Sequence, residues 1–287
     1  MTNKGKIVYL LSMMAMVFIV LGYISITQLK KSEITRITDE TIESIHTTSL
    51  DLFKNDVDFF NRELHKPEYY QTGKSIYLDR HDRLIGQLHN LIEEATQTEN
   101  INIDNDLLEI DSIAQRYDKA FKDLSAKITE KGFYKFGLEG KLLKAGEELE
   151  DEKLVDPEEL MLLEKHEKNY LLRGDSASIL ALHTLANRLI EKYKTHSAKK
   201  QGIENYVNAF NDFVAVSNEI GFSKQTGLKN ELNNRTDELL EAIGSLSTKA
   251  EEYTIRAFAR GHNMFMIAII TAVTFCFVLI ILIARKL

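Results

Sequence analysis

The sequence predicts an all-α protein, built as two stacked four-helix bundles from six helices, two long and four short. Three observations favour this fold class. Two apolar segments of about 20 residues, at positions 7–26 and 264–284, stand near the two ends of the 287-residue chain. Between them, apolar residues recur at three- and four-residue steps, as they do on one face of a helix. The whole chain has only two prolines, and part of the central region is repeated.

The two apolar segments predict membrane-spanning helices, because neither contains a charge and each is long enough to cross a bilayer core of about 30 Å. Residues 27–263 must then lie on one side of the membrane. We read residues 7–26 as a retained anchor, because the apolar stretch is longer than that of a cleaved signal peptide. Basic residues flank the outer sides of both segments: Lys4, Lys6, Arg285 and Lys286. They place residues 1–6 and 285–287 in the cytoplasm and residues 27–263 outside it.

The helices between the segments follow from caps and breakers. We expect the first helix to run from the first apolar segment to about residue 66, where Pro67 and Gly73 end it. Gly174 fits a left-handed closing position after the fourth helix, and Asp175 or Ser176 fits the cap of the fifth. The remaining expected helices span about 74–97, 105–153, 156–173, 175–196 and 199–260, with a polar linker at 98–104 and the last helix entering the second apolar segment.

An internal repeat indicates a duplicated three-helix unit. Tyr117, Phe121 and Gly132 recur as Tyr206, Phe210 and Gly221. In both copies a glycine cluster marks a point where a long helix can break or bulge. The expected membrane-proximal bundle comprises about 30–66, 134–173 and 223–260, and the membrane-distal bundle comprises about 74–133 and 175–222.

Three segments, 164–175, 137–142 and 227–232, resemble motifs of the helical bimodular sensor domain of bacterial chemoreceptors and sensor histidine kinases. The resemblance covers about residues 34–260. It implies a homodimeric receptor of the bacterial inner membrane whose bundles bind a small anion, often a carboxylate, or dock a periplasmic binding protein. Members of that family carry a signalling region after the second span. This chain ends at Leu287, so we expect that region either to have been cut away, which we favour, or to belong to a separate subunit.

An anion inside a helical bundle needs fixed positive charge and hydrogen-bond donors. In the proximal bundle, Arg235 is the main candidate, with Thr41 and Thr48 on the first helix opposite it. The alternative is that Arg235 reaches solvent or pairs with Glu238, and that the threonines bond to their own helix. In the distal bundle the candidates are Arg116, Tyr117, Tyr206, Arg83 and Arg188. The tyrosines also suit an aromatic core, and the matched arginines suit surface ion pairs.

Other functions lack motifs. We expect no catalytic residues, no metal site and no cofactor, because His166-Glu167 lacks the second histidine of a zinc helix and no phosphate-binding glycine loop is present. The net charge of -7 gives no basic stripe for nucleic acid. The remaining alternative to a sensor is a membrane-anchored helical tether or assembly subunit that binds a partner protein. The sequence does not identify the ligand.

Overall fold

The computed structural model describes residues 3–97 and 103–284, which form helices with no strand among them. The all-helical prediction is therefore confirmed. Part of the expected linker at 98–104 lies outside the described residues. The elements in chain order are α1 (Asn3–Asp58), η1 (Phe59–Glu63, a π-helical turn), α2 (Pro67–Thr72), α3 (Ile76–Gln97), α4 (Asp104–Lys131), α5 (Gly137–Asp151), α6 (Pro157–Arg173), α7 (Ser176–Lys192), α8 (Ser197–Ile220) and α9 (Gly227–Ala284).

The chain divides into two compact units. Unit 1 comprises Met1–Thr47, Asn90–Leu108 and Ala242–Leu287, and unit 2 comprises Thr48–His89 and Glu109–Glu241. Each unit is described by itself. The expected stacking of two bundles stays a prediction.

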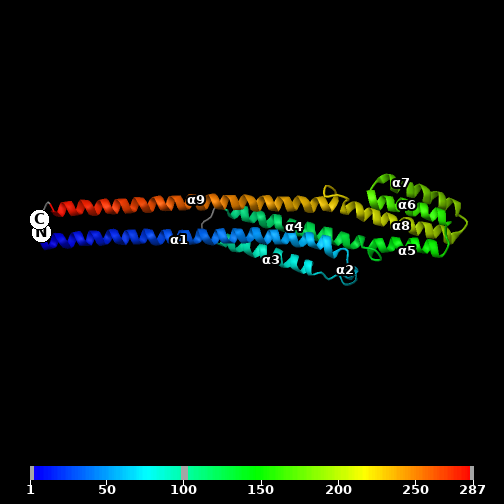
Figure 1. Cartoon of the computed structure of the whole chain (residues 1–287), viewed down its shortest axis with the longest axis horizontal. Coiled ribbons are helices and arrows are strands. Elements are labelled where there is room, and N and C mark those ends of the chain that lie inside the picture. Colours follow the sequence, from blue (N-terminus) through cyan, green and yellow to red (C-terminus); the bar gives the residue numbers. More distant parts are fainter. Residues whose placement is uncertain (1–2, 98–102, 285–287) are drawn as a thin grey trace. The chain divides into compact units, whose positions relative to one another are not determined.

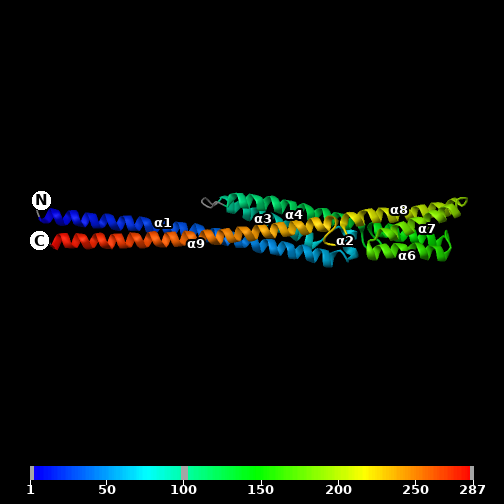
Figure 2. The same ribbon diagram turned by 90° about the horizontal axis from the view of Figure 1, so that it is seen from above.

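Unit 1 brings together the beginning of α1 and the end of α9, which run side by side in both views (Figures 1 and 2). The hydroxyl of Thr254 on α9 donates to the carboxylate of Asp39 on α1 at 3.0 Å, and Lys249 on α9 pairs with Asp106 on α4 at 2.6 Å. By length and composition, α1 and α9 can each cross a membrane. The two helices are also continuous beyond their apolar segments, as predicted.

The buried stripe of α1 follows a strict heptad spacing of four and three residues. The side chain of Asp56 is buried in this stripe, whereas that of the neighbouring Val57 is exposed. The stripe comprises Thr38, Ile42, Ile45, Ser49, Leu52 and Asp56 of α1 and continues through Phe59 and Glu63 of η1. Asn55, next to Asp56, is buried as well. A polar residue therefore occupies a core position of α1.

The two glycine clusters break the predicted long helices, and the two breaks have the same geometry. Gly132 and Gly221 have φ values of 86° and 89°, and Gly137 and Gly227 have φ values of 63° and 60°. All four lie in the left-handed region that side chains with a Cβ rarely adopt. The repeat seen in the sequence is thus also a repeat of local structure.

Helices α5 to α8 form a closed ring in unit 2: α5 contacts α6 and α8, and α7 contacts α6 and α8 (Figure 1). They share one apolar core that includes Leu149, Leu163, Leu189 and Phe210. This corrects the expected grouping, which placed 134–173 and 175–222 in different bundles. The physical reason is the short connections, because helices joined by a few residues pack as antiparallel neighbours.

The end of α6 and the cap at the start of α7 agree with the prediction. Gly174 has a φ of 66° and closes α6, and the carboxylate of Asp175 accepts a hydrogen bond from the backbone N–H of Ser178 at 2.7 Å. Pro67 differs from the prediction, because it starts the short helix α2 instead of ending a long one. Proline suits the first turn of a helix, where its missing N–H would have no partner.

Candidate functional site

Two of the predicted binding residues, Arg116 on α4 and Arg235 on α9, share one carboxylate in unit 2. Arg116 donates from Nη2 to Glu238 at 2.7 Å, and Arg235 donates from Nη1 to the other oxygen of Glu238 at 2.9 Å. Hydrogen bonds from Arg235 and then from Arg116 lower the pKa of Glu238. The Nε of Arg235 is buried and has no hydrogen-bond partner among the described residues. Of the two alternatives for Arg235, the structure therefore shows the ion pair with Glu238. Arg116 from a second helix also pairs with Glu238.

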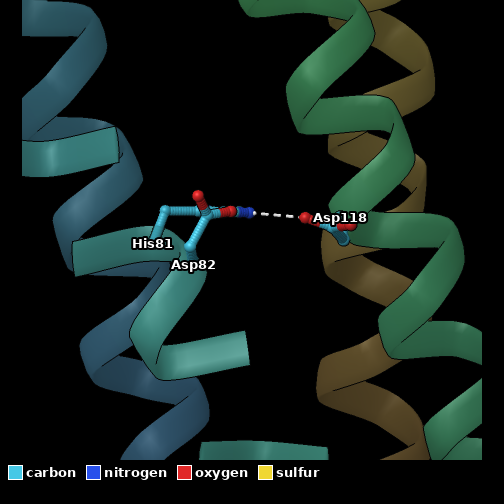
Figure 3. Close-up of side chains that lie close together, drawn as sticks. All are labelled: His81, Asp82 and Asp118. Carbon is cyan, nitrogen blue, oxygen red and sulfur yellow. Dashed lines mark hydrogen bonds and ion pairs between the residues drawn. The ribbon is translucent and has the colours of Figure 1, made fainter. Parts of the chain in front are cut away.

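A histidine buried among α1, α3 and α4 forms a second polar centre. His81 on α3 is only 1% exposed, and its Nδ1 lies 2.9 Å from both carboxylate oxygens of Asp56 on α1. Its Nε2 lies 2.9 Å from Oδ1 of Asp118 on α4 (Figure 3). The ring also stacks on Phe121, with 3.9 Å between ring centroids. One imidazole thus links three helices.

The carboxylate of Asp56 is surrounded by donors. Tyr117 on α4 donates its hydroxyl to Oδ2 of Asp56 at 2.5 Å, and Asn55 donates its amide to Oδ1 at 3.1 Å. Asn55 also donates to the backbone carbonyl of Tyr77 at 2.9 Å. Burial, and then the negative charge of Asp56, raise the pKa of Tyr117 well above its usual value. The hydroxyl of Tyr117 therefore stays a donor across the physiological pH range.

The outer side of this centre is open to solvent and contains a lysine. Lys122 Nζ lies 2.9 Å from Oδ1 of Asp118 and 3.1 Å from Oδ1 of Asp82. The side chains of Lys122 and Asp82 are 53% and 64% exposed. His81, Asp82 and Asp118 each offer one potential metal-ligand atom, and these three atoms lie within 4.8 Å of one another. We had expected no metal site.

Tyr206, the repeat partner of Tyr117, has a similar environment in a different place. Its buried ring lies on α8 and its hydroxyl donates to the carboxylate of Glu167 on α6. Burial and the charge of Glu167 raise the pKa of Tyr206, and burial raises the pKa of Glu167. Both tyrosines are therefore core residues, as in the aromatic-core alternative, and their hydroxyls donate to carboxylates of the chain itself.

The other predicted binding residues do not gather into a site. Thr41 donates its hydroxyl to the backbone carbonyl of Ile37 at 2.9 Å, as in the alternative of a bond to its own helix. Thr41 belongs to unit 1, whereas Thr48, which is half-buried, belongs to unit 2 with Arg235. Arg83 and Arg188 are exposed.

Sequence reasoning missed His81, Asp56 and Asp118. The signal that could have found the first two is the heptad: counting strictly in steps of four and three from Ile45 reaches Asp56, and counting back from Leu88 and Leu84 reaches His81. An acid and a histidine at core positions of neighbouring helices indicate a buried polar pair. Asp118 follows the core residue Tyr117 and gives no such signal.

Comparison with known proteins gives no relative. No protein-family model, no curated protein and no solved structure matches the chain at a significant level.

Proposed function

We propose that this chain is the sensing and signal-transducing part of a bacterial receptor. In this proposal α1 and α9 cross the inner membrane, residues 27–263 lie outside the cytoplasm, and two copies form a homodimer. A small anion of the carboxylate class binds to the helices of unit 2, or a periplasmic binding protein docks there. The binding changes how α1 and α9 are held and so passes a signal to the cytoplasmic side.

One observation carries the proposal: a single turn of α4 holds both helices that continue into the candidate spans. Tyr117 on α4 donates to Asp56 of α1, and Arg116 beside it donates to Glu238 of α9. A ligand that changed either contact would act on the same turn and therefore on both helices. Such a ligand shifts the equilibrium between two arrangements of these helices only to the extent that it binds one of them more tightly than the other.

The arginine pair is where a carboxylate ligand would act. Arg116 and Arg235 each donate one N–H to a different oxygen of the same carboxylate, so a carboxylate here receives two charge-assisted hydrogen bonds. Glu238 fills this place from within the chain, so it competes with an outside carboxylate. Both arginine side chains are partly exposed, at 41% and 33%, and solvent therefore reaches them.

The test is a thermal-shift screen of the purified full chain against organic acids and amino acids. We expect at least one carboxylate to raise the melting temperature of the wild type. Arg235→Ala should abolish that increase. Glu238→Gln should strengthen binding by roughly tenfold, because it removes the charge of the internal competitor and leaves the two arginines one side-chain oxygen as an acceptor in place of two.

Arg188→Ala is the matched control, because Arg188 is an exposed arginine with no part in the pair. It should bind the same ligand as the wild type does. Direct sensing at this pair would be wrong if no carboxylate stabilised either the wild type or Glu238→Gln. A binding protein that is retained by the wild type and lost with Arg116→Ala would then support the coupled form of the receptor.

A further inference from the structure

We infer that His81, Asp82 and Asp118 form a binding site for a divalent transition-metal ion of the zinc type. The inference goes beyond the proposed function and does not depend on it. The three potential ligand atoms lie within 4.8 Å of one another and come from two helices, α3 and α4. His81 is fully buried, Asp118 is partly exposed and Asp82 is exposed, so the site has a closed inner side and an open outer side.

The position of Asp56 behind the ring supports a metal site. Histidine ligands of metals nearly always donate their other ring N–H to a carboxylate or carbonyl, which fixes the ring and its tautomer. A carboxylate oxygen of Asp56 lies 2.9 Å from Nδ1 of His81, and the same carboxylate accepts hydrogen bonds from Tyr117 and Asn55. Nε2 is thereby directed toward Asp118. The imidazole is thus already oriented as a ligand by groups that do not reach the metal.

The distance between His81 and Asp118 requires little movement to admit a metal ion. Ligand atoms about 2.0 Å from a tetrahedral zinc ion are about 3.3 Å apart. His81 Nε2 and Asp118 Oδ1 are 2.9 Å apart, so they need to separate by only a few tenths of an ångström. The metal ion binds the lone pair of Nε2, and where that nitrogen carries a proton, the proton is released to water. Water completes the coordination on the open side.

The ammonium group of Lys122 shows that a positive charge is accommodated between the two carboxylates. This group lies between Asp82 and Asp118, at 3.1 and 2.9 Å from their oxygens. The side chain of Lys122 is 53% exposed and can turn into solvent. Lys122 therefore competes with the metal, and the ion replaces it between the two carboxylates. One imidazole nitrogen and two carboxylates suit zinc and its first-row neighbours better than calcium or magnesium, which prefer oxygen ligands alone.

The experiment uses the full chain in detergent, purified through a tag without histidines and dialysed against a chelator. Zn²⁺ is titrated by calorimetry, and bound metal is counted by mass spectrometry after gel filtration. We expect one Zn²⁺ per chain. Asp118→Asn should weaken binding at least about tenfold. Lys122→Met should tighten it by about two- to fivefold, because it removes the competing ion pair.

His89→Gln is the matched control. His89 and Asp111 form another histidine–aspartate pair between α3 and α4, with 2.7 Å between Nδ1 and Oδ1, but the side chain of His89 is 57% exposed. This variant should bind Zn²⁺ as the wild type does. The Co²⁺-loaded wild type should show visible absorption bands that Asp118→Asn loses.

The inference is overturned if the wild type retains no stoichiometric Zn²⁺, if Asp118→Asn binds as tightly as the wild type, or if His89→Gln removes the binding. Circular dichroism of each variant checks that its helices are intact. Because Lys122→Met and Asp118→Asn should change affinity in opposite directions, a general loss of structure cannot imitate the expected result.

Discussion

At the scale of single residues, two acidic side chains inside the helical packing, Asp56 and Glu167, each accept a hydrogen bond from a tyrosine hydroxyl. Glu167 is half-buried on α6 and receives the hydroxyl of Tyr206. Burial raises the pKa of Glu167, and the Tyr206 hydrogen bond offsets part of that effect. In the folded chain Glu167 therefore holds its proton to a higher pH than it does in the unfolded chain.

This difference predicts how stability depends on pH. A raised folded-state pKa stabilises the fold fully below the unfolded pKa, and that contribution is lost as pH rises through the folded pKa. Glu167→Gln stays neutral at every pH and keeps an acceptor for Tyr206. We therefore expect its melting temperature, relative to the wild type, to increase by a few degrees between about pH 4 and about pH 7.

Thermal melting followed by circular dichroism at several pH values measures the effect. Glu150→Gln on α5 is the control, because Glu150 is exposed, and its difference from the wild type should stay nearly constant. A Glu167→Gln difference that shrinks with rising pH would contradict the assignment of a raised pKa.

The candidate site was predicted only in part from the sequence. Arg116, Arg235 and Tyr117 were expected to bind a ligand. Arg116 and Tyr117 are neighbours on α4, and Arg116 shares the carboxylate of Glu238 with Arg235. Of their partners, Glu238 was foreseen as the alternative partner of Arg235, whereas Asp56 and His81 were not foreseen. A periodic run of apolar residues predicts a core face, and a buried polar centre interrupts that pattern.

At the scale of elements, the helices were predictable because caps and breakers act locally. Gly174 and Asp175 marked the end of α6 and the start of α7 correctly. Which helices pack together depends on contacts between distant residues, so the ring of α5 to α8 was missed. The sequence indicated that the chain could break at Gly132 and Gly221, and both breaks are present.

The two repeated breaks predict large effects of adding one methyl group. A Cβ at Gly132 would overlap the backbone carbonyl of Phe136, and a Cβ at Gly221 would overlap that of Thr226. Both glycines also have a positive φ. We expect Gly132→Ala and Gly221→Ala each to lower the free energy of unfolding by at least about 1–3 kcal/mol.

Gly86→Ala is the comparison, because Gly86 lies within α3 and a Cβ there meets nothing within 4 Å. It should raise the free energy of unfolding by about 0.5–1 kcal/mol, since alanine favours the helix. Urea titration followed by circular dichroism measures all three variants. Equal effects at the three sites would mean that the breaks do not have the observed backbone geometry.

At the scale of the whole molecule, two helices can cross a membrane, and the direction in which they cross is a prediction from flanking charge. The chain has a single cysteine, Cys276, which lies in the second apolar segment. Replacing it with alanine gives a background for labelling. Glu158, at the start of α6, is exposed and suits a new cysteine.

The labelling uses intact bacterial cells whose outer membrane is permeable and a maleimide that cannot cross the inner membrane. We expect this maleimide to react with Glu158→Cys in the Cys276→Ala background. Lys6→Cys in the same background should react only after the inner membrane is opened, because residue 6 precedes the first segment. The reverse pattern of labelling would place residues 27–263 in the cytoplasm and would remove the basis for an external sensor.

Asp56 also limits how α1 can move against its neighbours in unit 2. The carboxylate is held by His81 from α3 and by Tyr117 from α4. Sliding α1 along its axis by one helical turn, about 5.4 Å, would separate it from both partners and leave a buried charge without them. Motions that keep the network intact are small rotations and tilts about this point. The buried acid therefore acts as a pivot for α1, and a piston stroke of a full turn requires breaking it.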